Sequence, residues 1–81
     1  MSSPYDPEPI EVIAPKGAPK AVKFRNRLLQ VKEVLNTWRI DDEWWREPIS
    51  RLYYLLEFTS GKRFTVFQDL ITGRWHRQNW V

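Results

Sequence analysis

The chain contains no cysteine and only one histidine, which excludes several kinds of site. Without cysteine there is no disulfide, no Cys-based zinc site and no Cys–His nucleophile pair. No apolar run approaches the roughly 20 residues that a membrane-spanning helix requires, and the N-terminus lacks the regions of a secretory signal. We therefore expect a cytoplasmic protein that makes no use of a membrane and folds without cross-links.

Residue patterns that would support catalysis are also scarce. The lone histidine, His76, lies in an apolar and basic stretch, and no serine has a G-x-S-x-G context. The three glycines are isolated, so there is no phosphate-binding loop. The acidic triplet at residues 41–43 lacks the spacing of a calcium-binding loop. We predict no catalytic residue, no metal ion, no cofactor and no enzymatic activity.

Aromatic residues are abundant, since Phe, Trp and Tyr make up 15% of the 81 residues. Each can bury roughly 150–250 Å², so a few of them can build the core of a short chain. Charge is uneven: residues 16–81 carry all 13 Lys and Arg against seven Asp and Glu, a net charge of +6. This balance permits a polyanionic partner, although a mixed, solvated surface has the same composition.

Residues 1–19 contain five of the six prolines, which disfavour both helix and sheet pairing. We predict a flexible, acidic, Pro-rich arm over residues 1–19 and a small β domain over residues 20–81. The arm has one apolar cluster, formed by Ile10, Val12 and Ile13. As the alternative, this cluster docks on the domain as a short edge strand.

Residues 28–38 are ambiguous between helix and strand. Residues 21–24 alternate as in a strand, and residues 25–27 read as a tight turn. Beyond this turn, four apolar residues from Val31 to Trp38 recur at helical spacing, but no capping residue precedes them. A β-bulge near residues 32–33 would produce the same spacing. We favour a long, bulged strand and keep the helix as the alternative.

The next segment, residues 41–48, is acidic and ends in proline. We predict a connection there, with at most one turn of helix that has Asp41 as its N-cap. Beyond it, apolar and polar residues alternate over residues 51–58, 63–67 and 74–80.

Turn residues that include Gly61 and Gly73 separate these three stretches, so we predict an antiparallel meander. With the two earlier strands, the expected fold is all-β: a five-stranded, strongly bent sheet or a small SH3-like barrel.

The mixture of basic and aromatic residues on these strands suggests a binding surface. Proteins that bind single strands use cations to follow the phosphates and exposed rings to stack on bases. The same rings would serve a small core, and aromatic residues with arginine also anchor protein interfaces. The candidate nucleic-acid-binding residues are Arg39, Arg51, Tyr53, Arg63, Arg74, Trp75 and Arg77.

Two stretches resemble a known family: Trp38-Arg-Ile-Asp-Asp-Glu-Trp-Trp45, and Gly61-Lys-Arg-Phe-Thr-Val-Phe-Gln-Asp69 with Thr72-Gly-Arg-Trp75 after it. The pattern is similar to a small bacterial domain of unknown function. That domain occurs alone or near the C-terminus of Y-family-polymerase-like proteins, including the inactive polymerase-like subunit of the bacterial mutagenesis complex. The resemblance covers residues 22–80.

The resemblance implies an all-β module linked to translesion synthesis or DNA repair, with no catalytic residues to carry over. We therefore expect a non-enzymatic accessory module of bacterial DNA repair. Its expected partners are single-stranded or duplex DNA and a DNA polymerase or repair protein. The alternative is a protein-interaction module that has no affinity for nucleic acid and offers a sheet edge to its partner.

Overall fold

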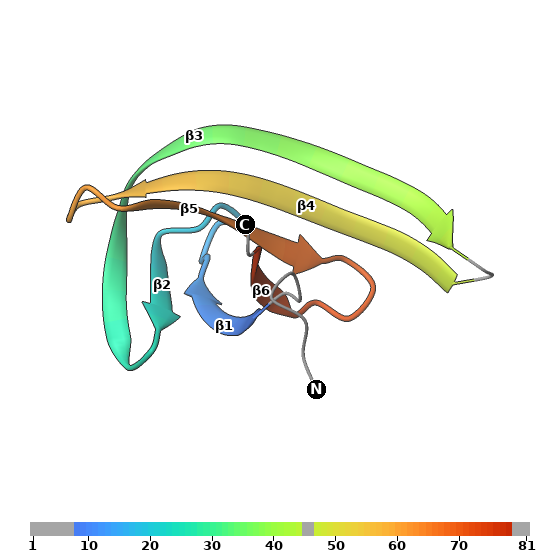
Figure 1. Ribbon diagram of the computed structural model, residues 1–81, viewed down its shortest axis with the longest axis horizontal. Helices are drawn as coiled ribbons and strands as arrows, with labels where there is room; N and C mark the ends of the chain where they lie inside the picture. The colour runs from blue at the N-terminus through green and yellow to red at the C-terminus, as the bar shows by residue number, and fades with distance from the viewer. Residues whose placement is uncertain (1–7, 45–46, 79–81) are drawn as a thin grey trace.

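The computed structural model describes residues 8–44 and 47–78, and these residues form six β-strands and no helix (Figure 1). Each strand pairs antiparallel with the next and β6 pairs with β1, so the strands form a closed barrel. The predicted all-β, antiparallel fold is confirmed. The strands are β1 (Glu8–Ile13), β2 (Ala21–Phe24), β3 (Arg27–Trp44), β4 (Glu47–Phe58), β5 (Arg63–Asp69) and β6 (Trp75–Gln78).

The strand that the sequence did not predict is β1, which lies within the expected flexible arm. That expectation is wrong for residues 8–13, because β1 pairs with β2 on one side and with β6 on the other. Ile10 and Val12 pack against the core, and their burial offsets the entropy lost on ordering the segment. The docked-strand alternative is the better description, although β1 closes the barrel instead of forming an edge. Residues 1–7 of the arm lie outside the described residues.

Residues 28–38 lie within the long strand β3, as we favoured, and not in a helix. Its pairing with β4 shifts register between Val31 and Glu33 and again between Val34 and Asn36. The first shift confirms the predicted bulge. A bulge inserts one extra residue and bends the strand, so Val31 and Val34 both pack against the core despite their odd separation. Residues 27–30 of β3 pair with β2, and from Val31 onward β3 pairs with β4.

The predicted connection over residues 41–48 is wrong. β3 continues to Trp44 and β4 begins at Glu47, so most of this segment is a two-stranded ribbon that extends beyond β5 (Figure 1). Asp41 is therefore not a helix N-cap. Pro48 is compatible with the ribbon because β5 does not reach it, so its missing N–H faces no third strand.

The remaining strands and turns agree with the predicted meander. Leu52, Tyr54, Leu56 and Phe58 alternate toward the core, where Val22 and Val66 meet them. Gly61 and Gly73 have φ angles of 89° and 79°, so both turns use the left-handed region that glycine permits. Residues 79 and 80 of the last predicted strand lie outside the described residues. Within the described ranges there is no helix that could cross a membrane.

Candidate functional site: a basic cleft between two turns

The seven candidate residues do not share one face of the sheet. Directly opposed residues on paired strands have side chains on the same face, so the register assigns each one. Arg39, Trp75 and Arg77 belong to the inner face, Arg51, Tyr53 and Arg63 to the outer face, and Arg74 precedes β6. The register thus places Trp75 and Arg77 on the opposite face of the sheet from Tyr53. The role of the seven residues in binding stays a prediction.

Tyr53 lies on the outer face but is only 6% exposed. Trp38 stacks on it with ring centroids 5.3 Å apart, and Phe67 lies 5.0 Å away on its other side. The guanidinium of Arg51 lies 4.6 Å from the centre of the Phe67 ring. These side chains cover one another, so Tyr53 has no open ring face on which a base could stack.

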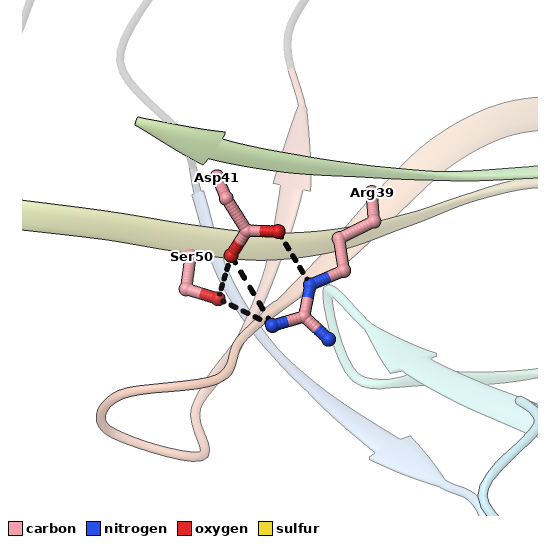
Figure 2. Close-up of polar contacts among 3 residues, drawn as sticks. All are labelled: Arg39, Asp41 and Ser50. Atoms are coloured by element: carbon pink, nitrogen blue, oxygen red, sulfur yellow. Dashed lines mark hydrogen bonds and ion pairs between the residues drawn. The ribbon is translucent and has the colours of Figure 1, made fainter. Parts of the chain in front are cut away.

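Arg39 is paired with an acid on the inner face of the β3–β4 ribbon (Figure 2). Its Nε donates a hydrogen bond to Asp41 Oδ2 at 2.7 Å, and its Nη2 donates to Asp41 Oδ1 at 3.2 Å. The Ser50 hydroxyl donates to the same Oδ1 at 2.7 Å. The hydrogen bonds from Arg39 and Ser50 lower the pKa of Asp41 below its ordinary value. The Arg39 charge is thus already compensated, which weakens its case as a phosphate contact.

Two turns place a different set of basic residues together at one end of the barrel. Arg25 and Asn26 connect β2 to β3 with φ angles of 51° and 63°. Positive φ at both central residues is the geometry of the tight two-residue hairpin turn. The β4–β5 turn, which includes Lys62, lies across from it, and both turns line a common cleft.

The cleft has an apolar floor and a basic rim. Phe24 and Phe64 meet at 5.6 Å between ring centroids, and Leu29 lies beside them. The Arg77 guanidinium lies 5.0 Å from the centre of each of these two rings. The cleft comprises two overlapping hollows of about 270 and 350 Å³. The residues of its rim are Arg25, Arg27, Lys62, Arg63 and Arg77.

Acidic residues compensate this rim only in part. Glu57 accepts a hydrogen bond from Arg63 at 3.0 Å, and Glu8 lies 3.8 Å from Arg25. Among the described residues, Arg27 and Lys62 make no ion pair. The cleft therefore keeps a net positive charge next to the half-buried rings of Phe24 and Phe64. Phosphate is a strong partner for such arginines, and guanidinium groups and rings both stack on bases.

The lining of the cleft consists of phenylalanine, leucine, arginine and lysine. None of these side chains is a ready general base or nucleophile at neutral pH without a strong pKa shift. In the part of the chain that the structure describes, no group of three or more His, Asp or Glu residues is placed to hold a metal ion. The arrangement suits the binding of an anion that carries a flat, apolar part.

Most of the cleft residues were not identified from the sequence as site residues, although the basic turns that carry some of them are visible there. Both tight turns carry basic residues, in Arg25-Asn26-Arg27 and in Gly61-Lys62-Arg63. Only the pairing order shows that these turns adjoin each other, since more than 30 residues separate them in the chain. The missed residues are Phe24, Arg25, Arg27, Leu29, Lys62 and Phe64.

Comparisons of the chain with protein-family models, with curated proteins and with solved structures found no match.

Proposed function

We propose that this protein is a non-enzymatic module that binds single-stranded nucleic acid in the basic cleft. The observation that supports it is the position of five cationic side chains around Phe24 and Phe64. Cations attract the phosphates, and the apolar floor accepts a base that is not stacked on its neighbours in the strand. Duplex bases offer no such face, so single strands bind more tightly than duplexes. Of the seven residues predicted from the sequence, Arg63 and Arg77 belong to this cleft.

We further propose that the module is an accessory of bacterial DNA repair or translesion synthesis. Support for this role comes from the resemblance of residues 22–80 and not from the cleft itself. Its test is genetic: loss of the gene should lower survival or induced mutation frequency after ultraviolet irradiation. Unchanged survival and mutation frequency would leave nucleic-acid binding without a repair role.

Binding is tested by fluorescence anisotropy with a labelled oligothymidylate of about ten nucleotides, a length within the range that one small barrel covers. The affinity should fall steeply between about 50 and 200 mM salt, because bound phosphates release counterions. A matched duplex should bind more weakly at each salt concentration. An affinity that does not change with salt would contradict phosphate contact.

A matched pair of double variants locates the site. Arg27→Glu with Lys62→Glu reverses two charges on the rim, and Lys16→Glu with Lys32→Glu reverses two exposed charges away from the cleft. The first double variant should lose at least about tenfold more affinity than the second. Equal losses would mean that net charge alone attracts the strand, and the cleft assignment would fail. Thermal unfolding of both variants checks that the fold is kept.

The second candidate function is a protein-interaction module without affinity for nucleic acid. One observation favours it: over residues 31–44, β3 pairs with β4 along one edge and with no described strand along the other. Free strand edges accept added strands. If anisotropy shows no binding to the oligothymidylate even at low salt, this candidate replaces the first.

A further inference from the structure

The open edge of β3 contains a regular stretch with defined ends. From Asn36 to Trp44, nine consecutive residues pair with β4 without a register shift. The bulge between Val34 and Asn36 ends this stretch on the barrel side, and the end of the strand limits it on the other. Figure 1 shows β4 along one side of this part of β3 and no labelled strand along the other. Its outward backbone groups can therefore pair with another strand.

The two edges of the ribbon are not protected equally. The β4 edge carries Pro48, which has no N–H to offer and so resists strand addition. The β3 edge contains no proline from Asn36 to Trp44, and Ile40 at its midpoint is 43% exposed. An exposed apolar residue in a regular, proline-free edge favours pairing with a further strand.

Arg39 and Asp41 on this edge lie opposite each other in one register. If two copies pair antiparallel about Ile40, Arg39 of each copy lies opposite Asp41 of the other. Residues two apart in a strand share a face, so both cross pairs form on the face that carries the Arg39–Asp41 contact. The neighbouring same-face registers, centred on residue 39 or 41, would instead place Arg39 opposite Arg39 or Asp41 opposite Asp41.

We infer that two copies of this chain form a symmetric dimer through β3, with Ile40 on the two-fold axis. Asn36 of each copy then lies opposite Trp44 of the other, so the register uses the whole regular stretch and stops at the bulge. The result is a four-stranded sheet in the order β4, β3, β3 and β4. The basic cleft lies at the opposite end of the chain's long hairpin, so dimerisation is independent of nucleic-acid binding.

The first test measures the mass of the full chain by sedimentation equilibrium over micromolar to millimolar concentrations. The mass should rise from 9.8 kDa toward twice that value. Ile40→Lys places two ammonium groups opposite each other on the axis and should weaken association at least about tenfold. Leu28→Lys, at a residue that is 59% exposed but lies before the open edge, should leave association unchanged. A wild-type chain that stays monomeric would overturn the inference.

A charge-swap experiment tests the register. Arg39→Asp alone and Asp41→Arg alone should each prevent self-association, because like charges then face each other across the axis. An equimolar mixture of the two variants restores opposite charges at both positions and should yield a mixed dimer. If either single variant dimerises as the wild type does, or if the mixture stays monomeric, β3 does not pair in this register. Circular dichroism of each variant confirms that the barrel is folded.

Discussion

The indole ring of Trp38 lies parallel to the phenol ring of Tyr53, with centroids 5.3 Å apart and an interplanar angle of 5°. The two residues are directly opposed on β3 and β4, on the face that points away from the core. Tyr53 also packs against Phe67 on β5, and Phe67 stacks on His76 on β6. These four residues form an outer aromatic row across four strands, which stabilises the sheet from outside the barrel.

Loss of the Trp38 ring should destabilise the protein. Trp38→Ala removes the cover of Tyr53, and we expect the free energy of unfolding to fall by about 2 kcal/mol. This is less than the roughly 3–5 kcal/mol of a fully buried tryptophan, because Trp38 is half-buried. Trp38→Phe keeps an aromatic partner and should cost about 1 kcal/mol. Urea unfolding measures both, and equal losses for the two variants would contradict a role for ring stacking.

The closure of the barrel by β1 is tested by two neighbouring substitutions. Val12 packs against the core, whereas Ile13 is 50% exposed. Val12→Asp should lower the free energy of unfolding by roughly 2–4 kcal/mol, because it places a carboxylate in an apolar site. Ile13→Asp should change it by about 0.5 kcal/mol or less. Thermal unfolding compares the two, and similar small effects would mean that β1 is not part of the barrel in solution.

Arg25 occupies the left-handed region, which arginine adopts at a cost and asparagine adopts readily. Arg25→Asn should therefore raise the free energy of unfolding by roughly 0.5–1 kcal/mol. The same change removes a cation from the rim of the cleft, so affinity for the oligothymidylate should fall roughly threefold to tenfold. A chain that gains stability and loses binding would indicate that the strained residue is retained for the ligand. Lost stability would mean that the contacts of Arg25 with the Phe24 ring and Glu8 outweigh the strain of the turn.

Stability should depend on pH through His76. Burial lowers the pKa of His76 below its ordinary value of 6.5, and Arg51 and Arg74 act in the same direction against Asp69. The unfolded chain then binds a proton at a pH where the folded chain does not. This contribution to the free energy of unfolding is complete above pH 6.5 and decreases as pH falls toward the folded-state pKa.

Urea unfolding midpoints between about pH 5 and 8 measure this dependence. His76→Phe keeps a ring against Phe67 but removes the titrating group, so its midpoint should vary less over this range. A variant profile identical to that of the wild type would assign the dependence to other groups.

The long-range pairing of the chain was only partly predictable. Alternation over residues 51–58 predicted β4 and its inner face. A strand with one buried face shows alternating apolar and polar residues in the sequence. Local patterns did not predict the strand at residues 8–13, where the prolines suggested an arm. Pairing with β2 and β6 stabilises β1, and local preference does not. Local patterns failed again at residues 41–48, where acidic residues suggested a connection but an uninterrupted register with β4 continues the strand.

The sequence by itself determined the all-β class, the bulge in β3, the two glycine turns and the excess of positive charge in residues 16–81. These depend on local periodicity and on the backbone freedom of single residues. Only the tertiary structure decided which cations meet, because the turns at residues 25–26 and 59–62 become neighbours through the order of strand pairing. It also buried Tyr53, paired Arg39 with Asp41 and left one edge of β3 open, since each of these outcomes depends on contacts between separate strands.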